Sequence, residues 1–288
     1  MKKIKIKLGI IGFLPFDFDR KKITNWKSDL FEIVDDFEEY HLNQKSDTEN
    51  WGYSDTLLEE ELPDNFNADI FIGITYVPIE ANYYARRLSK NRVIFSYFEM
   101  AEIISNKNLP LENLLLRMLY SYSLIYIRYG NRMPLQTEHT SFAHDDTRGC
   151  IFDMNGIKSD VIYSLDRPII CDECTIKLRQ EKVSDNTINI VKKEIKKIKK
   201  NRYYKVIDFI KRKPILSLFI SFLIGILISI ISSSIYDLTL KDYIEKHKKQ
   251  EKIGQRNDLK TEKQEIRTTT KNIVHLADSA KYQDDSNK

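Results

Sequence analysis

All three cysteines of the chain lie in one short segment, together with one of its five histidines. The segment reads "HDDTRGCIFDMNGIKSDVIYSLDRPIICDEC" and runs from His144 to Cys174. Zinc binds thiolate and imidazole groups in closed tetrahedral sites, and a Cys-x-x-Cys pair is a common half of such a site. The spacing therefore predicts one structural zinc ion per chain with these ligands: His144, Cys150, Cys171 and Cys174.

The fourth ligand is less firmly specified by the sequence than the three cysteines. Besides His144, the side chains of His139 and Asp145 are near enough along the chain to bind the metal. Asp145 or Asp146 could instead orient a histidine ligand. An alternative without metal is that the thiols are simply buried, as free cysteines often are. Against it, both residues between the paired cysteines are acidic, which favours a metal-binding turn at the surface.

The zinc segment needs a folded scaffold, and the first 185 residues have the patterns of one. Three apolar runs are typical of buried strands: residues 4–14, 68–77 and 91–99. Two segments have a helical pattern: residues 25–44 and 111–130. Strands that alternate with helices indicate an α/β or α+β domain over residues 1–185. Because three cysteines do not make a disulfide framework, we expect this domain to lie in the reducing cytosol.

Residues 214–236 contain no charged side chain and are long enough to cross a bilayer, which takes about 20 apolar residues. They predict a single transmembrane helix; a buried core helix is the alternative, but such helices are rarely so uniformly apolar. Residues 191–213 before it carry eleven Lys or Arg and two acids, so the positive-inside rule places the domain in the cytoplasm, at a bacterial inner membrane. We expect residues 186–213 to form a basic juxtamembrane helix or linker, and residues 237–288 a polar tail.

The basic segment has apolar residues at helical spacing: Ile195, Ile198, Tyr203, Val206, Ile207 and Ile210. They predict either an amphipathic helix on anionic lipid or a solvated linker helix. Over the whole chain, 46 Lys and Arg against 42 Asp and Glu leave a charge of only +4, so charge alone gives no strong nucleic-acid signal. The basic stretch 80–92 fits the charged edge of a hairpin better than a phosphate contact.

The order of these elements resembles the archaemetzincin-type zinc metallopeptidases. The resemblance covers about residues 66–180 and rests on "FIGIT" (71–75), "VIFSY" (93–97), a helix at 112–129 and the zinc segment. In that family, the histidines of an H-E-x-x-H-x-x-G-x-x-H motif hold a catalytic zinc, the glutamate is the general base, and four cysteines hold a structural zinc.

The carry-over from that family is partial. Three of the structural-zinc cysteines have counterparts in this chain, and His144 falls where the third catalytic histidine stands, but Asp145 replaces the cysteine that follows it. The helix that should carry H-E-x-x-H has no histidine and no glutamate after Glu112. The resemblance therefore implies a pseudo-peptidase that has kept the structural metal and not the catalytic one.

These predictions describe a membrane-anchored, non-enzymatic sensor or effector whose zinc domain binds a cytosolic protein or ribonucleoprotein. By analogy with bacterial anti-phage effectors, loss of that partner would let transmembrane helices associate and perturb the membrane. Gly225 and the serines at 232–234 permit such close packing, so we expect a homo-oligomer. A membrane-tethered zinc metalloprotease that uses His139, His144 and Glu138 is the first alternative, and an inert membrane adaptor is the second.

Overall fold

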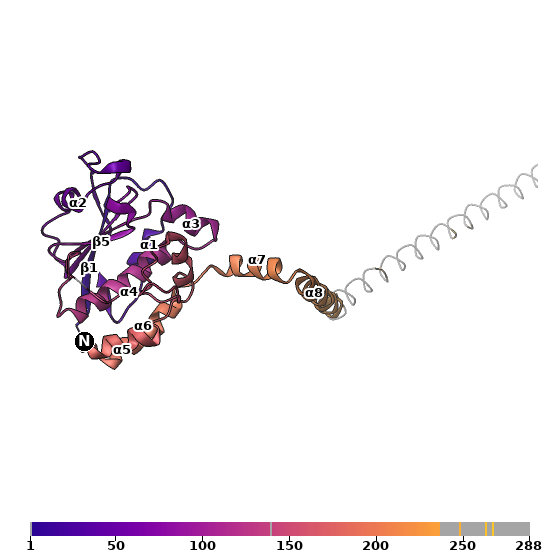
Figure 1. Cartoon of the computed structure of the whole chain (residues 1–288). Helices are drawn as coiled ribbons and strands as arrows, with labels where there is room; N and C mark the ends of the chain where they lie inside the picture. Colours follow the sequence, from indigo (N-terminus) through magenta and orange to yellow (C-terminus); the bar gives the residue numbers. More distant parts are fainter. Residues whose placement is uncertain (1, 139, 237–247, 249–262, 264–266, 268–288) are drawn as a thin grey trace, which may run out of the picture. The chain divides into compact units, whose positions relative to one another are not determined.

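The computed structural model describes residues 2–138, 140–236, 248, 263 and 267 (Figure 1). The chain divides into two compact units, Met1–Asp208 and Phe209–Lys288. The first unit is a mixed α/β domain and contains the predicted zinc segment.

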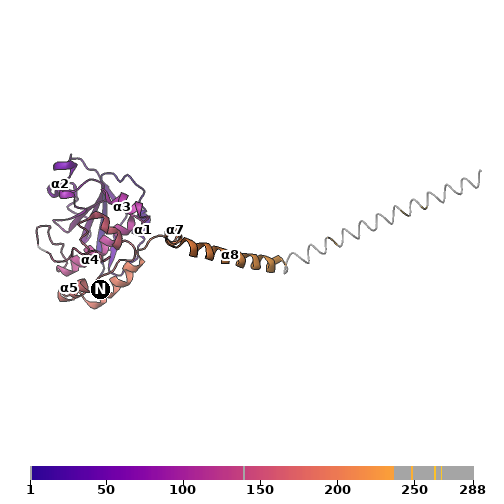
Figure 2. The same cartoon turned by 45° about the vertical axis from the view of Figure 1, so that its right-hand side comes forward.

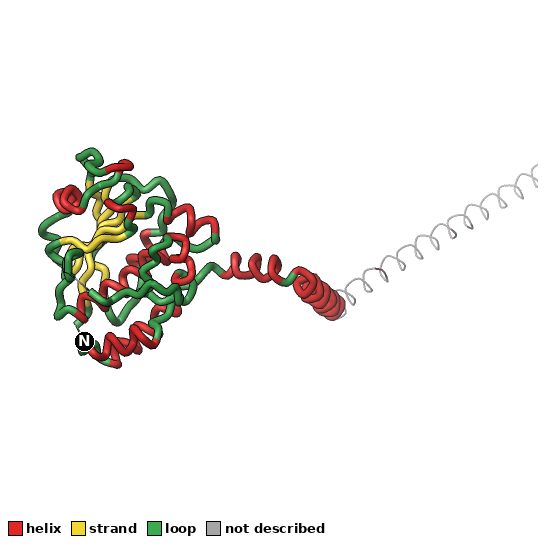
Figure 3. Tube along the Cα trace, in the orientation of Figure 1, coloured by secondary structure: helices red, strands yellow, loops and turns green. Residues whose placement is uncertain are grey.

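A single sheet of six strands forms the centre of the first unit (Figure 3). Its strands are β1 (Ile4–Ile11), β2 (Phe31–Ile33), β3 (Glu38–Tyr40), β4 (Ile70–Thr75), β5 (Ala85–Leu88) and β6 (Arg92–Ser96). They are ordered β2-β1-β4-β6-β5, and β3 also pairs with β1. All pairs are parallel except β5 with β6, so β5 is an antiparallel edge strand. The strands predicted at 4–14, 68–77 and 91–99 are confirmed as β1, β4 and β6.

The sheet is buried on both faces, as the nearly continuous apolar strands require. In β4, Ile70 and Ile72 join the larger core, whereas Phe71 between them joins a smaller one with Leu58 of α2 (Asp55–Glu61). Because neighbouring side chains of a strand point to opposite faces, the two cores lie on the two sides of the sheet. In Figures 1 and 2, α2 and α4 accordingly lie on opposite sides of the strands.

Six α-helices precede α7 (Arg202–Arg212) among the described residues of the first unit: α1 (Arg20–Thr24), α2 (Asp55–Glu61), α3 (Met100–Asn106), α4 (Glu112–Arg128), α5 (Asp172–Gln180) and α6 (Asp185–Glu194). Short 3₁₀ turns lie at η1 (Glu49–Trp51), η2 (Glu80–Asn82), η3 (Lys158–Ser164) and η4 (Ile195–Lys197). Serine caps define two of the helix starts: Ser54 accepts from the N–H of Leu57, and Ser184 accepts from that of Thr187. Such caps satisfy amide groups that the first helical turn leaves unpaired.

Helix α4 is the central helix of the domain and confirms the helix predicted at 111–130. Every residue from Glu112 to Tyr126 is buried. Its tyrosine Tyr120 both packs in the core and forms hydrogen bonds. The Tyr120 hydroxyl accepts a hydrogen bond from Trp26 Nε1 at 2.9 Å and donates one to Glu194 at 2.8 Å.

The helix predicted over residues 25–44 is wrong, because that segment forms β2 and β3. Phe31 pairs with Ile4 and Ile33 pairs with Ile6 in parallel register, so β1 supplies the partner that the local sequence does not reveal. Asp35 between the two strands has a φ of 62°, which breaks any helix there. The segment is therefore rich in helix-compatible residues, but its pairing with β1 decides its structure.

Part of the basic segment packs onto the domain. The first unit continues to Asp208, and both Ile195 and Ile198 are fully buried in the larger core. The apolar residues of α7 (Arg202–Arg212), Tyr203, Val206 and Ile210, are exposed instead. The helical pattern of residues 195–210 thus combines core residues of the domain with an exposed apolar stripe on α7.

The second unit contains helix α8 (Pro214–Ile235), which has Pro214 at its first turn. Among the described residues, this is the one helix long and apolar enough to cross a membrane, and none of its residues is buried. The predicted polar tail at 237–288 lies almost entirely outside the described residues.

Candidate metal centre

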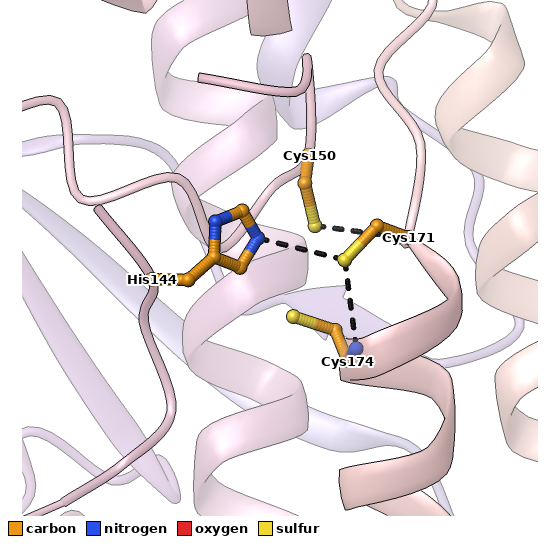
Figure 4. Close-up of side chains that lie close together, drawn as sticks. All are labelled: His144, Cys150, Cys171 and Cys174. Atoms are coloured by element: carbon orange, nitrogen blue, oxygen red, sulfur yellow. Dashed lines mark hydrogen bonds between the residues drawn. The ribbon is translucent and has the colours of Figure 1, made fainter. Parts of the chain in front are cut away.

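The predicted ligands come from two loops and the start of one helix (Figure 4). A parallel bridge to Asp153 positions His144, and a parallel bridge to Ile169 positions Cys150. Cys171 is the N-cap residue of α5, and Cys174 lies in the first turn of that helix. The two ends of the segment 144–174 therefore converge on one point.

The four side chains form a His/Cys3 metal-binding cluster. One ligand atom from each residue lies within 4.8 Å of all the others, and all four residues are buried. The Sγ atom of Cys171 lies 3.5 Å from Nε2 of His144. A tetrahedral zinc ion with Zn–S bonds of about 2.3 Å separates its sulfur ligands by about 3.8 Å. The donor set and the spacing both fit zinc.

Of the other two candidates for the fourth ligand, only Asp145 is among the described residues. Asp145 is exposed and is not part of it, whereas His144 is 9% exposed and points its ring at the sulfurs. The backbone carbonyl of Asp146 lies 2.9 Å from Nδ1 of His144. This contact fixes the ring so that Nε2 faces the thiols, as outer partners of metal-bound histidines commonly do. His139 lies outside the described residues.

Asp153 organises the loop that carries Cys150. Its Oδ2 atom accepts hydrogen bonds from the backbone N–H groups of Arg148 at 3.1 Å and Cys150 at 3.0 Å. Gly149 between them has a φ of 72°, and a Cβ atom there would lie 3.0 Å from the Tyr163 carbonyl oxygen. The turn before Cys150 is therefore tight, and it requires glycine.

The surroundings of the Cys150 sulfur favour its thiolate. The Cys150 pKa is lowered to about 5, because the Cys174 thiol and the backbone N–H groups of Cys171 and Phe152 donate hydrogen bonds to its sulfur. The pKa of Cys174 is raised, because its thiol donates to Cys150 and because it is buried. Without metal, these two thiols thus share a proton that a bound zinc ion would replace.

Arg148 adds positive charge at the edge of the cluster. Its guanidinium lies 3.8 Å from Cys171 Sγ and forms ion pairs with Asp146 and Glu173 at 2.7 and 2.9 Å. Three thiolates and one zinc ion leave a net charge of about −1, which a nearby guanidinium offsets. Arg148 and Asp153 were not identified from the sequence, because their roles depend on contacts that form only when the chain folds.

The fold and the site together define an α/β domain with a His/Cys3 zinc-binding cluster. No protein-family model and no curated protein matches the chain. Among solved structures, the chain is similar to the crystal structure of archaemetzincin from Methanopyrus kandleri. The TM-score is 0.40 and the sequence identity 12%, over 62% of this chain and 95% of that chain.

Proposed function

We propose that the zinc ion is structural and that the chain is a non-enzymatic, membrane-anchored module. One observation supports this most directly: the cluster offers four buried protein ligands, as many as a tetrahedral zinc ion binds. A hydrolytic zinc instead keeps one position open for water. In the metalloprotease alternative, His144 would serve a catalytic zinc, but it belongs to the cysteine cluster. No second group of three or more metal-competent side chains occurs among the described residues.

Metal analysis of the purified full-length chain tests this proposal. We expect one zinc ion per chain, because the cluster has one set of four ligands. We also expect no peptide cleavage that depends on the metal. Two zinc ions per chain, or proteolysis that a chelator abolishes and added zinc restores, would contradict a purely structural role.

The proposed anchor is helix α8, with the zinc domain on the cytoplasmic side of a bacterial inner membrane. Its 22 residues span about 33 Å at 1.5 Å per residue, the thickness of a bilayer core. The exposed apolar stripe and basic residues of α7 are suited to the surface of an anionic membrane. In this arrangement the domain binds a cytosolic partner, and association of α8 helices perturbs the membrane. The anti-phage role stays a prediction.

Two acidic substitutions in α8 test the anchor and the effector role together. We expect the wild-type chain to stay in the membrane fraction after an alkaline wash and to lower the membrane potential when induced. The double variant Ile220→Asp, Ile224→Asp should do neither, because each aspartate at the helix centre costs roughly 3 kcal/mol on insertion. The matched control Ile220→Val, Ile224→Val should behave as wild type. Wild-type chain that is anchored without changing the potential would favour the inert adaptor.

A further inference from the structure

A cavity of about 560 Å³ lies within the first unit, between α4, the edge strand β5 and the loop that follows the zinc ligand Cys150. This volume is typical of sites for small organic ligands. Aromatic side chains form much of its wall: Tyr83, Tyr84, Tyr122, Phe142 and Phe152. Two arginines, Arg87 of β5 and Arg117 of α4, also line it.

Both arginines are buried more deeply than a cation without a partner normally is. Arg87 is 6% exposed and Arg117 is 1% exposed. The guanidinium of Arg87 lies over the ring of Phe142 at 5.0 Å, and its Nη1 atom has no hydrogen-bond partner. Burial lowers the pKa of Arg87, yet an arginine stays protonated in a protein. The cavity therefore contains a desolvated positive charge.

Arg117 is held by neutral groups alone. Its Nη2 atom donates to the backbone carbonyl of Asp153 at 2.8 Å, and its Nη1 atom lies 3.6 Å from the sulfur of Met118. Its Nε atom is buried without a partner. In the part of the chain that the structure describes, no carboxylate forms an ion pair with Arg87 or Arg117.

Neither of the two acids that line the cavity forms an ion pair with Arg87 or Arg117 among the described residues. Glu138 forms two hydrogen bonds of 2.7 Å with Arg132, which lower its pKa to about 2. The Oδ2 atom of Asp153 accepts from the two backbone N–H groups of the metal loop, whereas Oδ1 is buried without a hydrogen-bond partner and lies 3.5 Å from Nε2 of His144. An isolated buried cation is strongly unfavourable unless a counter-ion reaches it. A bound anion would supply that counter-ion.

The geometry points to this cavity as a binding site for a small molecule that carries a phosphate or carboxylate group next to an aromatic ring. Arg87 and Arg117 would bind the anionic group, since a guanidinium fork matches either oxyanion. The aromatic wall would cover the ring. The site is apart from the metal centre, but residues 151–156 form its wall directly after the zinc ligand Cys150. This binding site is an addition to the proposed function, which assigns the domain no small-molecule ligand.

Calorimetric titration of the zinc-loaded full chain in detergent tests this assignment with phenyl phosphate, benzoate and neutral benzamide. Phenyl phosphate or benzoate should bind at least about tenfold more tightly than benzamide, the difference expected for hydrogen bonds between charged groups. The preferred probe shows whether the natural anion is a phosphate or a carboxylate. Equal binding of benzoate and benzamide, with no binding of phenyl phosphate, would overturn the proposal, as would no binding of any probe.

Arg86 offers a matched control for Arg87, because the neighbouring side chain on β5 forms an ion pair with Asp55 instead. Arg87→Met should weaken anion binding at least about tenfold without lowering the melting temperature, because it removes an unpaired buried charge. Arg86→Met should lower the melting temperature and leave anion binding unchanged. If the anion binds Arg87→Met and Arg117→Met as tightly as wild type, the assignment is wrong. If Arg87→Met does not fold, the comparison of the charged probes with neutral benzamide on the wild-type chain is sufficient to test the anion site.

Discussion

Replacing Cys171 by serine should release the zinc ion and destabilise the domain by several kcal/mol. Cys171 lies at the centre of the cluster, 3.5 Å from His144 Nε2, and its sulfur accepts from the backbone N–H of Cys174. A serine hydroxyl is not a thiolate, so the three remaining ligands would hold the metal weakly. Metal binding and folding are coupled at structural sites, where zinc contributes about 10 kcal/mol or more. That exceeds the stability of many whole domains, about 5–15 kcal/mol.

Zinc content and urea unfolding, both measured on the full chain, check this expectation. A strong chelator should shift the wild-type transition toward that of Cys171→Ser and should leave the variant unchanged. Asp172→Ser is the matched control, because Asp172 is the next residue, exposed and outside the cluster. It should keep its zinc and lose no more than about 1 kcal/mol, the helix-dipole contribution of one acid. A Cys171→Ser variant that keeps both its zinc and its stability would show that Cys171 is not a ligand of a structural zinc ion.

The metal ligands could be predicted from the sequence, because their residue types and spacing within one short segment are typical of zinc sites. Cysteine and histidine at zinc-site spacing predicted a cluster that the fold then assembled, and α4 followed from its apolar pattern. Strands β2 and β3 could not be predicted in this way. Each is three residues long and is defined by pairing with β1, which is distant in the sequence.

The two arginines of β5 show the same limit at the level of single residues. Arg86 and Arg87 are identical in type and adjacent, so the sequence treated them as one charged edge. Alternation along the strand sends one side chain to Asp55 and the other into the cavity. The packing of α2 and α4 decides which face of β5 has an acid within reach of an arginine. The local sequence pattern does not contain that information.

Glu194 connects the start of the basic segment to the domain through buried hydrogen bonds. Glu194→Ala should therefore lower the free energy of unfolding of the domain by about 2–4 kcal/mol. Its buried carboxylate accepts hydrogen bonds from Ser28 Oγ at 2.6 Å, the backbone N–H of Asp29 at 2.8 Å and the Tyr120 hydroxyl at 2.8 Å. Burial raises the Tyr120 pKa, so this phenol remains a donor. Alanine would leave all three donors without their acceptor inside the protein.

Urea unfolding followed by tryptophan fluorescence is suited to this test, because Trp26 donates to the Tyr120 hydroxyl and lies next to the lost carboxylate. Glu102→Ala is the control, since Glu102 is an exposed glutamate on α3 and its removal should change the stability by less than about 0.5 kcal/mol. Glu194→Gln should fall between the two, because an amide keeps one acceptor oxygen but adds two donors to a site of donors. If Glu194→Ala unfolds at the same urea concentration as Glu102→Ala, the network contributes nothing. The C-terminal end of the first unit would then be stabilised by burial of apolar side chains such as Val191, Ile195 and Ile198.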